Sequence, residues 1–247
     1  MDRSVTCFLP FSDISSVKAS ITSLKAQGFD SRVFVVLPPG SEEQMKGTGA
    51  EFIVSGGFAS TGALKKMAAV ADSRFVLTYS KGFPLDMGSH ALARMMQICE
   101  DTGAGIVYSD YYEMKNEVMS PHPVIDYQEG SLRDDFNFGS VILYDGKAFR
   151  DACSRMGIEY SHAGLYDLRL KISQTHTLTH IQELLYTEVE TDTRKTGEKQ
   201  FDYVDPRNRA VQIEMESACT DHLRCIGGWL SPKFREVSPD DGGFEYD

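Results

Sequence analysis

Short apolar runs alternate with segments of helical periodicity through the first half of the chain. Runs of apolar, often β-branched or aromatic residues predict buried strands at 5–9, 33–37, 52–54, 75–77 and 106–108. Between them, apolar residues three or four positions apart predict helices, including one capped by Ser12 or Asp13 and one over 86–100. Because helices separate the strands, the pattern predicts an α/β fold with a mostly parallel sheet, right-handed crossovers and helices on both faces.

The second half of the chain is less regular. It predicts a strand at 139–144, a short helix or turn at 166–172 and a polar loop over 186–201. After an Asp205-Pro206 start signal, apolar residues from Val211 to Ile226 recur at helical spacing and predict one long C-terminal helix. We therefore expect one domain over 1–230, followed by an acidic tail or linker at 231–247 that frays or leads to a further domain.

Composition narrows the class of protein. Of the 247 residues, 41% are hydrophobic and 25% are charged, which is typical of a globular chain. The 25 Lys and Arg residues against 36 Asp and Glu give a net charge of -11, which argues against nucleic acid or an anionic membrane surface as the main partner. The five cysteines are scattered without Cys-x-x-Cys spacing, and no stretch is apolar enough for a signal peptide or a membrane span. These features predict a reduced, cytoplasmic protein.

In a parallel sheet, ligands bind beyond the carboxyl ends of the strands. The loops to consider are therefore 10–13, 38–43, 79–86 and 109–113. Asp134-Asp135 is a further acidic pair, which we interpret either as part of a loop facing an acceptor or as an ordinary surface loop. His176 and His180 lie four apart, but their surroundings predict a strand, where the two rings would be too far apart to share a metal.

Six short motifs follow these elements in order. They are Leu9-Pro10-Phe11, Ser23-Leu24 with Gln27, Tyr108-Ser109-Asp110, Asn137-Phe138-Gly139, Tyr166-Asp167-Leu168 with Leu170, and His180-Ile181 with Glu183, Leu185 and Tyr186. In this order they resemble the motifs of family 2 glycosyltransferases, in particular the rhamnosyltransferase-like branch. The resemblance covers 5–226. It implies the Rossmann-like GT-A fold and transfer of a sugar from a nucleotide-sugar to a glycan or lipid-linked acceptor in cell-surface polysaccharide synthesis.

The chain departs from the family where the family places its carboxylates. The second strand ends in 37–41 without an acid, and the position of the metal-binding Asp-x-Asp reads Thr78-Tyr79-Ser80-Lys81. Leu165 stands where the family has its catalytic base. A departing nucleoside diphosphate develops negative charge that a metal or another cation must stabilise. Because the Asp-x-Asp is missing, a Mn²⁺ or Mg²⁺ cofactor is doubtful, and we expect little dependence on divalent metal.

The resemblance assigns roles to the residues that remain. Phe11 and Asp13 would contact the nucleoside, and Asp110 would contact the donor sugar or its ribose. Lys81 would take the place of the metal, with Arg194, Lys195 and Lys199 adding diphosphate contacts from a closing loop. Asp167 would be the provisional general base.

Each of these residues also has a structural interpretation. Lys81 also fits a solvated turn residue, Asp110 a helix- or turn-capping residue, and Asp167 half of a surface ion pair with Arg169. Without its usual carboxylates, the same fold predicts an alternative function, a non-catalytic domain that positions a glycan or a neighbouring transferase domain. A nucleotidyltransferase is the third class considered, but the glycine-rich, basic phosphate loop that it needs near the first strand is missing.

Overall fold

The computed structural model describes residues 4–45, 50–189 and 209–231, and a nine-stranded sheet runs through the described chain. The strands are β1 (Val5–Pro10), β2 (Ser31–Leu37), β3 (Glu51–Val54), β4 (Phe75–Tyr79), β5 (Asp86–Met87), β6 (Ile106–Lys115), β7 (Val118–His122), β8 (Val141–Asp145) and β9 (Leu178–Val189). The helices are α1 (Ile14–Ala26), α2 (Thr61–Val70), α3 (Ala91–Thr102), α4 (Gly146–Ser154), α5 (Gly164–Ser173) and α6 (Arg209–Cys225), with a short 3-10 helix at Glu42–Met45.

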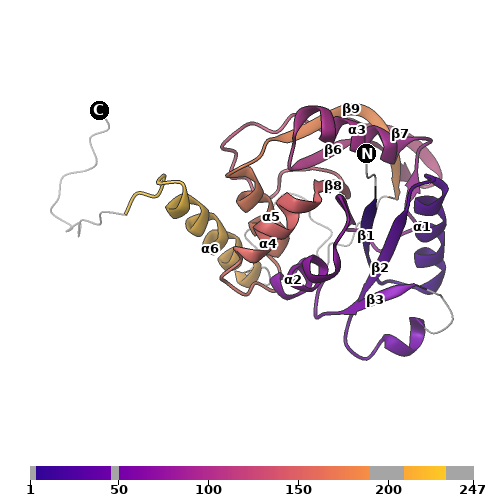
Figure 1. The fold of residues 1–247 in the computed structure, drawn as a ribbon, viewed down its shortest axis with the longest axis horizontal. Coiled ribbons are helices and arrows are strands. Elements are labelled where there is room, and N and C mark those ends of the chain that lie inside the picture. The colour runs from indigo at the N-terminus through magenta and orange to yellow at the C-terminus, as the bar shows by residue number, and fades with distance from the viewer. Residues whose placement is uncertain (1–3, 46–49, 190–208, 232–247) are drawn as a thin grey trace.

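The strand order is β3-β2-β1-β4-β8-β6-β9-β5, with β7 paired to β6. Strands β1 to β4 are mutually parallel, and β6 is parallel to β9. Strand β8 lies between β4 and β6 and is antiparallel to both. The predicted α/β fold with a mostly parallel sheet is thereby confirmed, with β8 as the central exception (Figure 1).

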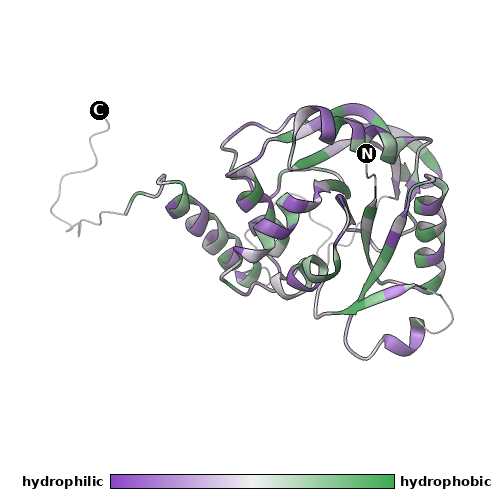
Figure 2. Cartoon of the chain, in the orientation of Figure 1, coloured by the Kyte–Doolittle hydropathy of each residue, from purple (hydrophilic) through white to green (hydrophobic). Residues whose placement is uncertain are grey.

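Helices cover both faces of the sheet, and each face has its own core. On one face, α1 and α3 pack on residues such as Cys7, Leu77 and Leu143. On the other, α2, α4 and α5 pack on Phe8, Val76 and neighbouring side chains. Figure 2 shows the apolar residues concentrated along the strands and the inner sides of the helices. Within the described ranges, no helix combines the length and the hydrophobicity needed to cross a membrane.

Local signals in the sequence set most helix starts. The Asp13 carboxylate accepts a hydrogen bond from the backbone amide of Ser16 at 2.9 Å and caps α1, and Ser60 caps α2 in the same way. The helix predicted over 86–100 instead begins at Ala91. Asp86 and Met87 pair with β9, so the first residues of the predicted helix belong to the sheet.

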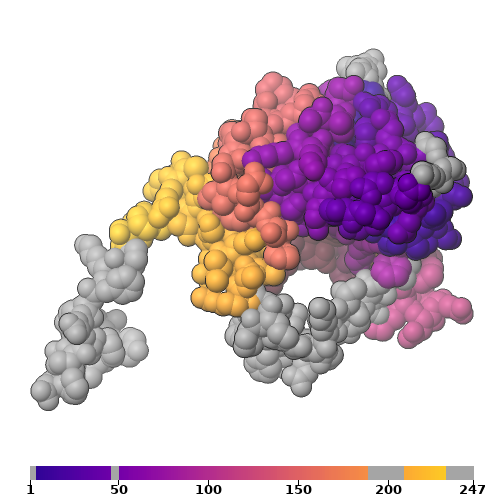
Figure 3. All heavy atoms as spheres, turned by 90° about the horizontal axis from the view of Figure 1, so that it is seen from below, coloured from indigo at the N-terminus to yellow at the C-terminus, as the bar shows by residue number. Residues whose placement is uncertain are grey.

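Helix α6 packs against α5 between Met215 and His222, and its C-terminal end extends away from the sheet (Figure 1), as the space-filling view also shows (Figure 3). The Glu214 carboxylate of α6 accepts hydrogen bonds from the backbone amides of Ser161, His162 and Ala163, at 2.7 to 3.1 Å. These amides precede α5, so Glu214 supplies the cap that Ala163 cannot provide. Burial works to raise the pKa of Glu214, but the three amide hydrogen bonds outweigh it, and the pKa lies below its ordinary value.

We expect Glu214→Ala to lower the free energy of unfolding by about 1–2 kcal/mol, because it removes a charged cap. A carboxyl with a lowered folded-state pKa stabilises the fold above its unfolded pKa of about 4.3, and this contribution is lost as the pH falls toward the folded pKa. Urea unfolding at neutral pH and near pH 3.5 measures both effects. The matched control is Glu216→Ala, on an exposed side of the same helix. Equal losses in the two variants, or a Glu214 effect that persists in acid, would contradict this role.

Candidate functional site

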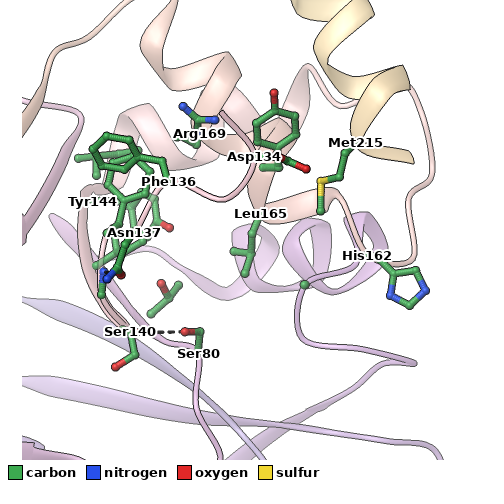
Figure 4. A pocket seen from close by; sticks show the side chains of 17 residues that line it. Ser80, Asp134, Phe136, Asn137, Ser140, Tyr144, His162, Leu165, Arg169 and Met215 are labelled. Carbon is green, nitrogen blue, oxygen red and sulfur yellow. Dashed lines mark hydrogen bonds between the residues drawn. The ribbon is translucent and has the colours of Figure 1, made fainter. Parts of the chain in front are cut away.

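A pocket of about 330 Å³ opens beyond the carboxyl end of β4 (Figure 4). Ser80 and the first residues of β8 form one side of it, and Leu165, Tyr166 and Arg169 of α5 form another. The segment 134–140 closes the pocket between these elements, and Met215 of α6 completes its wall. The site thus lies where a strand end meets a helix N-terminus, in the region where α/β sheets bind ligands.

One hydroxyl group holds the segment that leads into β8. Tyr186 of β9 accepts hydrogen bonds from the backbone amides of Ser140 at 2.8 Å and Val141 at 3.4 Å. The tyrosine can approach this closely because position 139 is a glycine with a φ of +72°. A Cβ at that position would overlap the Tyr186 hydroxyl oxygen. The Asn137-Phe138-Gly139 motif therefore shapes the pocket wall through its backbone.

Aromatic rings fill the space behind this wall. Phe138 lies edge-on to Tyr108, with ring centroids 4.9 Å apart, and packs beside Phe136 at 4.4 Å. The Tyr108 ring stacks on His180 at 5.0 Å. Phe136 and Phe138 also line the pocket, so its apolar side is held from behind by packed rings.

His180 lies between two carboxylates. Its Nε2 is 2.8 Å from an oxygen of Asp110, and its Nδ1 is 2.7 Å from an oxygen of Asp126. Asp110 also accepts a hydrogen bond from the backbone amide of Val124 at 2.8 Å. The hydrogen bond from His180 lowers the pKa of Asp126. This bridge fixes the segment after β7 to the sheet.

Arg169 is the charged residue most deeply placed in the pocket wall, with 6% of its surface exposed. Its guanidinium donates hydrogen bonds to the backbone carbonyls of Ser131 at 3.0 Å and Arg133 at 2.7 Å. It also lies over the rings of Tyr166 and Phe138. Among the described residues, no carboxylate lies within 4.0 Å of it. Burial lowers the pKa of this guanidinium.

Known structures share this architecture. S. aureus TarS 1-349 is 14% identical over 75% of this chain and 60% of its own, with a TM-score of 0.56. Its complex with UDP is 12% identical over 89% of this chain and 65% of its own, with a TM-score of 0.57. Its complex with UDP-GlcNAc gives a TM-score of 0.55 at 12% identity, over 89% and 71% of the two chains. This chain has a GT-A glycosyltransferase fold.

These similarities are structural only. No protein-family model matches the sequence, and no curated protein matches it either. The chain spans 60% of the length of the TarS 1-349 structure. The GT-A fold is therefore shown, whereas the rhamnosyltransferase-like branch implied by the sequence motifs stays a prediction.

The Asp-x-Asp position of the GT-A fold lies at the pocket, but its residues do not suit a divalent metal. Thr78 and Ser80 line the pocket and offer hydroxyl groups. Lys81 turns to β9 and forms an ion pair with Glu188, whose side chain is 5% exposed. Within residues 4–45, 50–189 and 209–231, no group of three or more His, Cys, Asp or Glu side chains could hold a metal ion. Lys81, which the resemblance places where the family has metal-binding carboxylates, is thus paired with a buried carboxylate in this structure.

The two residues predicted to meet the nucleoside lie in the β1–α1 loop. Phe11 packs against the core formed by Val17 and Leu37, and Asp13 caps α1. Ser12 donates a hydrogen bond to the carbonyl of Gly82, which joins this loop to the one that carries Lys81. The structure therefore brings Phe11, Asp13 and Lys81 to neighbouring loops, although none of them lines the pocket.

The other predicted residues lie farther apart. Asp110 is bound to His180, beneath the loop that leads to the pocket wall. Asp167 is 1% exposed and pairs with Lys171 at 2.5 Å, one helical turn further along α5, rather than with Arg169. Burial raises the pKa of this carboxyl, and the Lys171 ammonium opposes that shift. Arg194, Lys195 and Lys199 lie outside the described residues.

Sequence reasoning missed the residue that gives the pocket its charge. The sequence suggests only a surface ion pair with Asp167 for Arg169, because it does not show which side of α5 faces the sheet. For Asp134 the sequence leaves two interpretations open, a loop that faces an acceptor or an ordinary surface loop. The structure places this residue on the pocket wall (Figure 4). Phe136 and Phe138, five and three residues before β8 begins at Val141, are the sequence signal that could have indicated a pocket here.

Substitutions at Lys171 and Asp167 test whether the ion pair between these two side chains stabilises the fold. We expect Lys171→Met to lower the free energy of unfolding by about 3 kcal/mol, because it leaves a buried carboxylate without its cation. Adding Asp167→Asn should recover at least half of that loss, since the pair is then uncharged. Urea denaturation of the three proteins measures the cycle. Additive losses in the double variant would show that the two side chains do not stabilise each other.

Proposed function

We propose that this protein is a glycosyltransferase that moves a sugar from a nucleotide-sugar donor to a glycan or lipid-linked acceptor in cell-surface polysaccharide synthesis. The observation that carries the proposal is the pocket at the carboxyl end of β4, beside the N-terminus of α5, in a chain with a GT-A fold. S. aureus TarS, whose fold is similar, has been crystallised with UDP and with UDP-GlcNAc. The sequence motifs of the rhamnosyltransferase-like branch are compatible with this assignment.

The donor diphosphate would lie at the β4 end of the pocket. Ser80 provides a hydroxyl there, and the neighbouring Lys81 provides the ammonium that we propose in place of a metal. Its ion pair with Glu188 would keep the lysine near the strand end until the diphosphate arrives. Phe11 and Asp13 remain our candidates for the nucleoside, Asp110 for the ribose or donor sugar, and Arg194 and Lys195 for further diphosphate contacts.

The acceptor hydroxyl needs a general base, which typically contributes 10²–10⁴-fold in rate. Asp134 is the carboxylate among the described residues that line the pocket, and it lies above Leu165 in Figure 4. Asp167, the candidate from the sequence, lies behind the pocket wall in its pair with Lys171. Geometry favours Asp134, and we propose it as the base, with Asp167 as the alternative. The Asp167→Asn/Lys171→Met variant separates the two, because it would keep activity only if Asp134 is the base.

One observation favours a second candidate, a non-catalytic GT-A domain that binds and positions a glycan. Lys81 and Asp167 each have an internal ionic partner, Asp110 is hydrogen-bonded to His180, and none of the three lines the pocket. This arrangement is what we expect of a GT-A domain that has lost its catalytic residues but has kept its binding pocket. In that case a catalytic domain would have to act on the positioned glycan.

Calorimetric titration with UDP-GlcNAc, in EDTA and then in Mn²⁺, tests the proposal. We expect binding in EDTA, with an affinity that Mn²⁺ changes by no more than about twofold, because the site offers a lysine instead of carboxylates. Leu165→Trp should weaken binding at least about tenfold by filling the pocket. Ile158→Trp, at an exposed position outside the pocket, is the matched control.

Donors based on GDP and dTDP extend the same titration. A folded protein with no affinity for any nucleotide-sugar would contradict the glycosyltransferase and leave the binding domain. Strict dependence on Mn²⁺ would contradict the role of Lys81. Release of free nucleotide on addition of acceptor glycans separates the enzyme from a domain that binds a donor without transferring the sugar.

A further inference from the structure

The pocket has two chemically different ends. Ser80 and the hydroxyl groups around it lie at the β4 end, and Arg169 lies at the opposite end of the view in Figure 4. Between them, the wall is largely aromatic and aliphatic, with Phe136, Tyr144 and Leu165. Apolar rings are surfaces on which the C–H faces of a sugar can stack, while the two polar ends would orient it.

The charge at the Arg169 end is not neutralised by the described part of the protein. Its guanidinium donates hydrogen bonds to two neutral carbonyl oxygens and lies over the rings of Tyr127, Phe138 and Tyr166, all within the described part of the chain. The charge of Asp134 acts to raise the pKa of this guanidinium, but the two side chains form no ion pair in the described structure. An arginine keeps its charge in proteins, and a buried charge without a counterion is costly.

Such a cation attracts a complementary anion. The guanidinium is planar and has five N–H donors, which suits the two oxygens of a phosphate or a carboxylate. The backbone carbonyls of Ser131 and Arg133 hold the group in place, so little side-chain freedom would be lost on binding. Lys171, the other buried Lys or Arg among the described residues, has two carboxylate partners, Asp167 and Asp221.

We propose that Arg169 forms an oxyanion subsite at the acceptor end of the pocket, so that the acceptor is a sugar carrying a phosphate or carboxylate group. The inference rests on the proposed function, because it takes the β4 end for the donor. It adds the class of acceptor, which the fold does not specify. The aromatic wall would hold the sugar ring, and Arg169 would fix its charged substituent, leaving a hydroxyl near Asp134.

Three small sugars test this in calorimetric titrations of the full chain at low salt. Glucose 6-phosphate and glucuronate carry the two anionic groups, and glucose is their neutral counterpart. We expect the charged sugars to bind at least about tenfold more tightly than glucose, and about 0.5 M NaCl to weaken them. Whichever of the two binds more tightly identifies phosphate or carboxylate as the group. Equal affinity for glucose, or no effect of salt, would overturn the proposal.

Arg169→Gln should reduce the affinity for the charged sugars at least about tenfold and leave glucose unchanged. Arg150→Gln is the matched control, because Arg150 also donates to two backbone carbonyls, those of Ala71 and Ser73, but lies outside the pocket. Circular dichroism shows whether each variant folds. If Arg169→Gln does not fold, Arg169→Lys keeps the charge without the planar fork and should bind the charged sugars more weakly than the parent protein. Wild-type affinity in a folded Arg169 variant would refute the subsite.

UDP and UDP-GlcNAc titrated into the same variants separate this inference from the function on which it rests. We expect Arg169→Gln to bind both with the affinity of the parent protein. A loss of UDP affinity in Arg169→Gln would place the donor diphosphate at Arg169 and overturn the acceptor subsite. Donor binding without any charged-sugar binding would refute the subsite alone. Charged-sugar binding through Arg169 without donor binding would refute the glycosyltransferase and keep the subsite.

Discussion

The pocket depends on one buried hydroxyl group. Tyr186 accepts the amide hydrogens of Ser140 and Val141 and so sets the point at which β8 begins. Because β8 runs between β4 and β6, this point also decides where the segment 134–139 leaves the sheet. Gly139 makes the contact possible, since any side chain there would occupy the position of the hydroxyl. The aromatic side of the pocket is therefore a consequence of strand pairing rather than of a mobile loop closing over a ligand.

Buried charge is divided between pairs that stabilise the fold and a group that faces the pocket. Asp167 with Lys171 and Glu188 with Lys81 are internal ion pairs, and Asp110 is hydrogen-bonded to His180. Breaking such a pair is costly, so these residues have a structural reason to be present whatever the chemistry. Lys81 differs from the others because it lies next to Ser80, at the end of a strand that reaches the pocket. Arg169 has no such partner in the described chain, which makes it the group with charge left to offer a ligand.

The sequence predicted those elements whose signals are local. Hydrophobic runs located β1, β2 and β4, and Asp13 and Ser60 are caps that can be recognised from their neighbours. The pairing of strands that lie far apart in the sequence is not indicated by any local pattern of residues. Asp86 and Met87 read as the first turn of a helix, yet they pair with β9, a hundred residues later. The antiparallel course of β8 and the hairpin with β7 were missed for the same reason. The resemblance to glycosyltransferase motifs indicated the fold, but not which side chains turn toward the pocket: Asp167 and Arg169 are two residues apart on α5, and only Arg169 lines it.

The negative net charge of the protein makes the two cations Lys81 and Arg169 important for the binding of anionic ligands. A chain with a net charge of -11 repels a nucleotide-sugar or an anionic acceptor at long range, and salt screens this repulsion beyond about 10 Å. Attraction must then come from cationic groups in the pocket wall or beside it, where burial reduces screening. Lys81 and Arg169 are carried by separate elements, the β4–β5 loop and α5, so a change at one cation leaves the position of the other largely unaltered. In the site that we propose, the donor and the acceptor would therefore each meet a cation of their own, because Lys81 and Arg169 are fixed by different parts of the fold.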